Sequence, residues 1–153
     1  MNGNSGGCQC GAVRYHFEGP LGRASICHCR MCQKAFGSFG APLVSVPVAN
    51  FTWTRGHPGI FRSSAPVARG FCRDCGTPLF MQDDGDPNIE LAIGSLDDPN
   101  AVKLESQVGV ESKVAWFDSM PGLSAETTDQ NNPAARDLYH TRQHPDHDTE
   151  HWP

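Results

Sequence analysis

The stretch GGCQCG (6–11) places Cys8 and Cys10 two positions apart in a glycine-rich segment near the N-terminus. A second close pair, Cys72 and Cys75, occurs in the segment FCRDCG. A structural zinc ion takes four ligands at the corners of a tetrahedron, and two closely spaced cysteines can span one edge of it. The two pairs together therefore predict a closed four-cysteine zinc site. Because Cys72 follows Cys10 by 62 positions, this site would join distant parts of the chain and stabilise the fold.

Three further cysteines, Cys27, Cys29 and Cys32, lie in the segment ICHCRMCQK (26–34). Three thiolates can hold one zinc ion and leave its fourth position open, which is the feature that separates catalytic from structural zinc sites. Zinc with three thiolates keeps a formal charge of about −1, so we expect it to activate water poorly and to accept a further thiolate instead. The triplet therefore predicts a second zinc site, making two zinc ions per chain, with chemistry directed at a thiol.

Other uses of these cysteines are compatible with the sequence. Cys27 and Cys29 would also form an acceptable site with Cys72 and Cys75. A histidine could close the triplet into a purely structural site, or the three thiols could form a redox cluster without metal. His28 is a poor candidate for that fourth ligand, because a residue between two ligands in an extended segment points the other way.

The charge of the chain is unevenly distributed along the sequence. The net charge is −5 at neutral pH, but residues 1–80 carry +6 and residues 81–153 carry −11. All seven cysteines lie in the basic part, where zinc-bound thiolates would offset some of the positive charge. The remaining positive charge suits a small anion, whereas nucleic acid requires a basic stripe with interleaved aromatic residues. We therefore expect no nucleic-acid partner.

The first residues, MNGNSGG, lack the charged region and apolar run of a secretory signal peptide. No apolar stretch approaches the length of a membrane span, so we expect no membrane partner. We therefore expect a cytoplasmic protein whose cysteines serve as metal ligands or reactive thiols rather than as a disulfide framework. Only 38% of the residues are hydrophobic, and bound metal would help to stabilise so small a core.

The pattern along the chain is typical of short β-strands separated by turns, so we predict a mainly β fold. In AVRYHF (12–17), Val13, Tyr15 and Phe17 alternate with other residues, which indicates a half-buried strand. In SFGAPLVSV the alternation slips near Val44, which suggests a bulge or bend. Further strand segments are predicted at 50–54, 59–63, 67–71, 77–81, 88–94, 106–112 and 113–118.

Two smaller features complete this pattern. The segment SLDDPNAV (95–102) predicts a helical turn capped by Asp97 or Asp98. Phe51 and Trp53 are aromatic residues of one strand segment, and we expect them in the core rather than in the wall of a pocket.

From about Met120 the composition becomes polar and acidic. We therefore predict a zinc-binding β domain over 1–123 and a polar, loosely docked C-terminal extension over 124–153. Four histidines of the extension are spaced by four, three and four positions: His140, His144, His147 and His151. This spacing would align them on one helix face, but Pro145 disfavours a continuous helix, so adventitious metal binding is the preferred interpretation.

Five segments, GGCQCGAVRY, CHCRMCQKAFG, FCRDCGTPLF, IGSLDDP and SKVAWFD, occur in an order that resembles the family of glutathione-dependent formaldehyde-activating enzymes. This GFA family also includes the centromere protein V domain. The resemblance runs from about Gly6 to Leu123 and rests on all three cysteine clusters. It implies an Mss4-like fold of stacked antiparallel sheets pinned by zinc, with short helical turns.

By the family pattern, Cys8, Cys10, Cys72 and Cys75 match the structural zinc ligands. The same pattern matches the triplet of Cys27, Cys29 and Cys32 to a second, catalytic zinc site.

The activity that the resemblance implies is that of a carbon–sulfur lyase, which makes or breaks S-hydroxymethylglutathione from glutathione and formaldehyde. The expected partner is a small thiol such as glutathione or its adduct, with the substrate sulfur directed at the open position of the second site. Arg30 and Lys34 are expected to hold a glutathione carboxylate; solvated surface charge is the alternative interpretation. The alternative function is that of a non-catalytic, zinc-stabilised binding module of the same fold, which the acidic extension does not favour.

Overall fold

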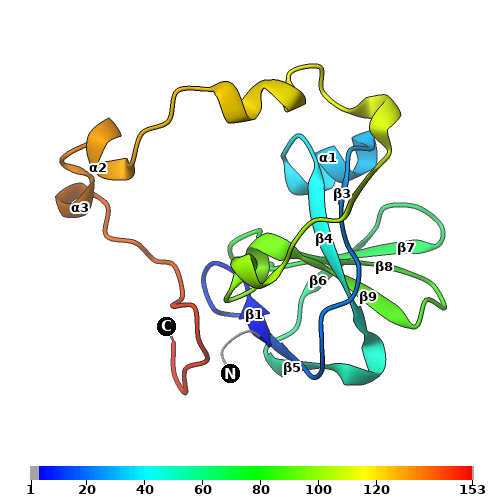
Figure 1. Cartoon of the computed structure of the whole chain (residues 1–153). Helices are drawn as coiled ribbons and strands as arrows, with labels where there is room; N and C mark the ends of the chain where they lie inside the picture. The colour runs from blue at the N-terminus through cyan, green and yellow to red at the C-terminus, as the bar shows by residue number, and fades with distance from the viewer. Residues whose placement is uncertain (1–3, 153) are drawn as a thin grey trace.

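The computed structural model describes residues 4–152 and consists of two β-sheets with a few short helices (Figure 1). The smaller sheet has the strand order β1-β2-β5, with bounds β1 Ser5–Gly7, β2 Arg14–Phe17 and β5 Phe51–Arg55. The larger sheet has the order β10-β3-β4-β9-β8-β7-β6. Its strands are β3 Ala24–Cys27, β4 Ala41–Pro47, β6 Gly59–Arg62, β7 Val67–Phe71, β8 Pro78–Asp83, β9 Asn88–Ala92 and β10 Ser106–Val108. The predicted mainly β class is confirmed.

Pairing within the sheets is antiparallel except at one edge. β10 pairs with β3 in parallel, with Ser106 opposite Ser25, so the larger sheet is mixed rather than purely antiparallel as expected. β1 also contacts the segment that follows β9, because Gly6 forms an isolated antiparallel bridge to Leu96. A Cβ at Gly6 would collide with the Tyr15 hydroxyl and the Ser95 carbonyl, so this close approach requires glycine.

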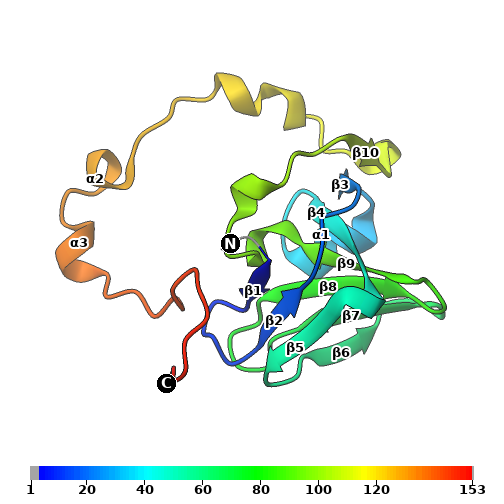
Figure 2. The same ribbon diagram turned by 60° about the horizontal axis from the view of Figure 1, so that its bottom comes forward.

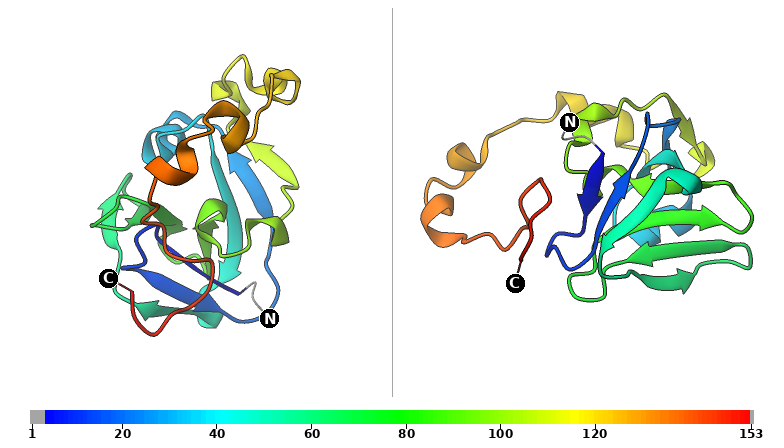
Figure 3. Two further views of the ribbon diagram at one scale, coloured as in Figure 1. Left: turned by 90° about the vertical axis from the view of Figure 1, so that its left-hand side faces the viewer. Right: turned by 90° about the horizontal axis from the view of Figure 1, so that it is seen from below.

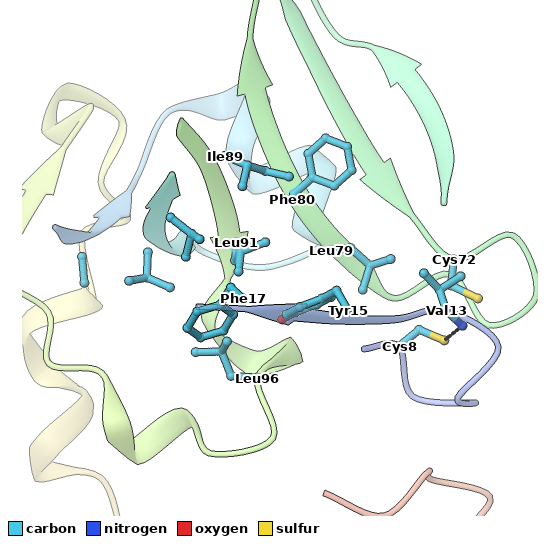
Figure 4. Close-up of a cluster of buried hydrophobic side chains, with 13 residues drawn as sticks. Cys8, Val13, Tyr15, Phe17, Cys72, Leu79, Phe80, Ile89, Leu91 and Leu96 are labelled. Atoms are coloured by element: carbon cyan, nitrogen blue, oxygen red, sulfur yellow. Dashed lines mark hydrogen bonds between the residues drawn. The ribbon is translucent and has the colours of Figure 1, made fainter. Parts of the chain in front are cut away.

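The main hydrophobic core lies between the smaller sheet and one face of the larger sheet (Figure 4). Val13, Tyr15 and Phe17 are all buried, which confirms the alternation predicted for β2. They pack with residues of β4, β8 and β9. Phe51 and Trp53 of β5 pack against the same cluster, which confirms their expected core role.

The sequence suggested a bulge or bend near Val44, and the structure has no bulge there. β4 pairs without interruption with β3 and with β9. Leu43 packs in the small cluster around Cys32, whereas Val44 packs in the main core. Since successive side chains of a strand point to opposite faces, a strand covered on both faces carries consecutive apolar residues without any slip of register.

The longest α-helix, α1 (Arg30–Phe36), was not anticipated from the sequence. It follows β3 directly and ends at Gly37, whose φ of 58° is a left-handed conformation suited to glycine. α2 (Thr128–Asn131) and α3 (Ala135–Leu138) are single turns in the C-terminal extension. Short 3₁₀ helices occupy Val48–Asn50, Ile93–Ser95, Pro99–Ala101, Val110–Ser112 and Phe117–Gly122. No helix within 4–152 has the length and apolar character needed to cross a membrane.

Two predictions for local structure have different outcomes. The strand predicted at 113–118 is wrong, because this segment leads into the 3₁₀ helix that begins at Phe117. The turn predicted at 95–102 is confirmed, and its cap is Asp98, whose Oδ1 accepts the Asn100 N–H at 3.0 Å. Asp97 instead forms an ion pair with Arg14.

The C-terminal extension runs apart from the sheets as an arc and then returns beside β1 (Figures 2 and 3). The return is fixed at His144, whose backbone N–H donates to the Gln9 carbonyl at 2.7 Å and whose side chain is buried. The other three histidines of the extension are exposed, and residues 139–152 form no helix, so no shared histidine face exists there. The returning segment also covers Arg14, which the β2 pattern placed on the solvent face.

Candidate metal centres

The four cysteines of the two pairs come together at one end of the sheets. Cys8 and Cys10 lie in the turn between β1 and β2, and Cys72 and Cys75 lie in the turn between β7 and β8. Their four sulfur atoms lie within 4.8 Å of one another, with Cys8 and Cys10 3.6 Å apart and Cys10 and Cys72 3.8 Å apart. A tetrahedron with zinc–sulfur bonds of 2.3 Å has edges of about 3.8 Å, so the spacing fits zinc.

The surroundings of this first cluster act differently on its four thiols: burial raises the pKa of Cys8, Cys10 and Cys72, although backbone N–H groups oppose that rise. The Val13 N–H points at Cys8 Sγ at 3.3 Å (Figure 4), and the Asp74 N–H points at Cys72 Sγ at 3.4 Å. Burial opposes ionisation of Cys75, but the Thr77 hydroxyl at 3.1 Å and nearby backbone groups lower the pKa of Cys75 to about 6. Donors directed at sulfur are what thiolate ligands of a metal require, so the donor set also fits zinc.

The remaining triplet forms a second cluster at the junction of β3 and α1. Cys27 ends β3, Cys29 caps α1, and Cys32 lies in the first turn of α1, so one short segment supplies all three sulfur atoms. These atoms lie within 4.8 Å of one another, and no further cysteine, histidine or carboxylate in 4–152 completes the group. The alternative site combining Cys27 and Cys29 with the 72–75 pair is not the arrangement found.

The three thiols of the triplet differ in their electrostatic surroundings. Burial raises the pKa of Cys27 to about 12. Burial also acts on Cys29, but the Cys32 N–H, 3.4 Å from its sulfur, and the neighbouring thiols lower the pKa of Cys29 below its ordinary value. A metal bound to all three sulfur atoms would override this difference, because coordination deprotonates thiols.

His28 lies between two residues of the triplet but faces away from it. Its side chain is fully buried, with Nε2 2.9 Å from Gln107 Oε1 and its ring edge-on to Phe117 at a centroid distance of 4.7 Å. It is not part of the metal-ligating group, which agrees with the expectation from its position in an extended segment. His28 therefore packs against β10 through Gln107 and against the 3₁₀ helix that begins at Phe117.

The two basic residues expected to hold a substrate carboxylate lie exposed on α1. Arg30 donates through Nη1 to Gln33 Oε1. Gln33 in turn donates to the carbonyls of His28 at 2.7 Å and Ser112 at 2.9 Å, so Arg30 is partly fixed at the helix surface. Lys34 forms no ion pair within 4–152.

Arg69 is a residue of this site that the sequence analysis missed. It lies on β7, is 6% exposed, and donates through Nη2 to Cys32 Sγ at 3.3 Å. The sequence of VARGF held a signal for it, because an arginine in the middle of an otherwise apolar strand segment must face something polar if the strand is buried.

An aromatic cavity of about 300 Å³ adjoins Arg69. It lies between the end of α1 and strands β6 to β8, and its walls include Ala35, Phe36, Phe61, Phe71 and Phe80. A second cavity, of about 250 Å³, shares Phe36 and Pro78 with the first and extends to Thr77, which contacts Cys75. Together the two cavities extend from Arg69, which contacts Cys32 of the triplet, to Thr77, which contacts Cys75 of the first cluster.

Comparisons with known proteins agree with this architecture. A family model described as glutathione-dependent formaldehyde-activating enzyme matches residues 4–112, which contain all seven cysteines. The crystal structure of a Rhodobacter sphaeroides protein is similar to this chain with a TM-score of 0.55 and 22% sequence identity. The similarity covers 68% of this chain and 99% of that one, and it shows a shared fold. The match over most of the chain, with both cysteine clusters assembled, shows that this chain belongs to the family of glutathione-dependent formaldehyde-activating enzymes.

Proposed function

We propose that this protein is a zinc-dependent carbon–sulfur lyase that acts on a thiol adduct such as S-hydroxymethylglutathione. The observation that carries the proposal is the triplet of Cys27, Cys29 and Cys32, whose sulfur atoms converge without a fourth protein ligand within 4–152. A site of this kind retains a position for a substrate atom, whereas the four-cysteine cluster is closed and suits a structural role. Family membership supports the same reaction class.

Cys27, Cys29 and Cys32 would hold the second zinc ion. When bound, that ion supplies a Lewis acid that keeps a thiol ionised at neutral pH. In the synthetic direction the thiol sulfur forms a bond to the formaldehyde carbon, and the thiol proton is transferred to the oxygen that becomes the new hydroxyl. In the reverse direction the carbon–sulfur bond breaks, and the hydroxyl proton returns to the thiol.

The neighbouring residues have supporting roles in this proposal. Arg69 fixes the orientation of Cys32 through the bond from Nη2 to Sγ. Arg30 and Lys34, exposed on α1, would attract the carboxylates of glutathione from solution. The first cluster of Cys8, Cys10, Cys72 and Cys75 would hold a structural zinc ion and keep the β7–β8 turn against the N-terminal strand.

The test compares Cys32→Ser with wild type and with Met31→Leu, a matched control at an exposed position of the same helix. Zinc per chain is measured on protein purified anaerobically, and interconversion of glutathione, formaldehyde and adduct is followed by exchange NMR against the uncatalysed rate. We expect about two zinc ions and accelerated exchange for wild type and the control. Cys32→Ser should lose one zinc ion and the acceleration. Undiminished activity in Cys32→Ser would overturn the proposal and leave a zinc-stabilised binding module.

A further inference from the structure

Arg69 is buried in the larger sheet and uses only part of its hydrogen-bonding capacity. Its Nε donates to Ser63 Oγ at 3.0 Å, and its Nη2 donates to Cys32 Sγ at 3.3 Å. Its Nη1 is buried and has no hydrogen-bond partner among the residues that the structure describes. A buried guanidinium nitrogen without an acceptor is costly, so this position calls for a further acceptor that the protein itself does not provide.

No carboxylate within 4–152 neutralises Arg69. The strand register places Phe61, Arg69, Met81 and Glu90 in one row across β6, β7, β8 and β9. Glu90 therefore lies two strands from Arg69, which corresponds to about 10 Å, and no ion pair joins them. Met81, between them, packs in the cluster around Cys32, so this face of the sheet is the one beneath the triplet.

The cavity beside Arg69 is suited to an anion attached to an apolar group. Arg69 is the charged residue among those lining it, and four phenylalanines, Phe36, Phe61, Phe71 and Phe80, form much of the wall. Aromatic walls reduce contact with water, which strengthens a hydrogen bond between a guanidinium and a carboxylate. The same guanidinium contacts Cys32, so an anion at Nη1 would lie next to the metal-ligating sulfur atoms.

We propose that Arg69 anchors a carboxylate of the substrate through Nη1, so that the preferred substrates are thiols carrying a carboxylate a few bonds from sulfur. This inference rests on the proposed function, because it assumes that a substrate sulfur is directed at the triplet. It assigns the selection of an anionic substrate to a buried residue of β7, in addition to the exposed Arg30 and Lys34 of α1. Arg69 is thereby a substrate-positioning residue as well as a support for Cys32.

The experiment measures thiol binding without turnover. The full chain is loaded with Co²⁺ in place of zinc, and the visible spectrum is followed during titration with mercaptopropionate and with its methyl ester, a neutral ligand of nearly the same shape. A charge-assisted hydrogen bond corresponds to about 10- to 100-fold in affinity, so wild type should prefer the acid to the ester by that factor. Arg69→Gln should bind both ligands equally, because the charged hydrogen bond to the acid is lost, and a retained preference for the acid would overturn the proposal. Arg62→Gln, an exposed arginine on β6, is the matched control and should keep the preference.

The outcomes separate this inference from the proposed function. Equal affinity of wild type for the acid and the ester would overturn the role of Arg69 while leaving thiol binding intact. Absence of any spectral change with either thiol would overturn both. If Arg69→Gln fails to retain cobalt, Arg30→Gln and Lys34→Gln decide the point: the preference for the acid should survive in both, and its loss in either would overturn the role of Arg69.

Discussion

Arg14 and Asp97, 83 positions apart, form a buried bidentate ion pair with Nη1–Oδ1 at 2.7 Å and Nη2–Oδ2 at 2.6 Å. Both side chains are nearly inaccessible to solvent, at 3% and 4% exposed. The Ser5 hydroxyl donates to Asp97 at 2.5 Å, and Asp148 of the C-terminal extension contacts Arg14 at 2.7 Å. The pair thus links β2, the turn after β9 and the extension at one point beside the first cysteine cluster.

Loss of Arg14 should destabilise the protein strongly. Arg14→Gln leaves the Asp97 carboxylate buried without a guanidinium, which costs about 3–5 kcal/mol in comparable buried pairs. We expect this decrease in the free energy of unfolding by denaturant titration. Arg62→Gln breaks the exposed bidentate pair with Asp84 and should leave stability unchanged within error. Equal effects of the two substitutions would contradict the assignment of stability to the buried pair.

The contribution of Asp97 should depend on pH in a defined direction. Burial alone would raise the pKa of Asp97, but hydrogen bonds from Arg14 and Ser5 hold that pKa below its ordinary value. The stabilisation is therefore complete above the unfolded-state pKa of about 3.9 and is lost as pH falls through the lower folded pKa. The stability difference between wild type and Asp97→Asn should be constant near neutral pH and shrink in acid. A difference that grows on acidification would refute this.

The two cysteine clusters should differ in what they contribute to stability. Cys72→Ser should lose one zinc ion and unfold at a clearly lower temperature, because this cluster joins segments 62 positions apart. Cys32→Ser should also lose one zinc ion but shift the unfolding midpoint less, since Cys27, Cys29 and Cys32 belong to one local segment. Metal analysis and thermal unfolding of both variants test this. A larger shift for Cys32→Ser would show that the assigned roles are reversed.

Docking of the extension should depend on Gly11. Gly11 and Gly76 each follow the second cysteine of a pair with φ of 77°, so alanine at either position introduces similar backbone strain. Only at Gly11 would a Cβ meet the extension, colliding with the His144 ring and lying 2.6 Å from Trp152 Cδ1, whereas Gly76 faces open space. Gly11→Ala should accelerate tryptic cleavage after Arg142 severalfold, and Gly76→Ala should not. Equal cleavage rates would show that the extension is not held at Gly11.

Docking should also weaken in mild acid through His144. Burial lowers the pKa of His144, and although the Pro145 carbonyl opposes this, Arg14 and Arg55 reinforce it. Because the folded pKa lies below the unfolded value of about 6.5, docking is fully stabilised above pH 6.5 and weakens as pH falls below it, by up to about tenfold per pH unit. Cleavage after Arg142 should therefore accelerate in that range. His144→Gln should abolish the pH dependence, and persistence of the dependence would implicate another group.

The features that the sequence predicted correctly depend on the spacing of residues that lie close together in the chain. Short spacers between cysteines restrict which of them can share a metal, so spacing favoured a set of four and a set of three, and the assembled clusters decided against the alternative set of Cys27 and Cys29 with Cys72 and Cys75. Alternating apolar residues indicate a strand with one face packed against the core, and this rule identified strand β2 correctly. The same rule wrongly suggested a bulge or bend at Val44. It assumes that one face of a strand meets solvent, whereas β4 is covered on both faces.

The sequence by itself determined the mainly β class, the closely spaced cysteines as candidate metal ligands and the helical turn at 95–102, since each depends on residues close together in the chain. Only the tertiary structure decided that Arg69 reaches Cys32, that Arg14 is buried against Asp97, and that His144 docks beside Gly11. These relationships join residues 37, 83 and about 130 positions apart, and nothing in the local sequence pattern indicates which distant groups the sheets bring together. Long-range packing determines the partners of polar groups, because most buried donors are paired and their acceptors lie on segments that only the fold brings together.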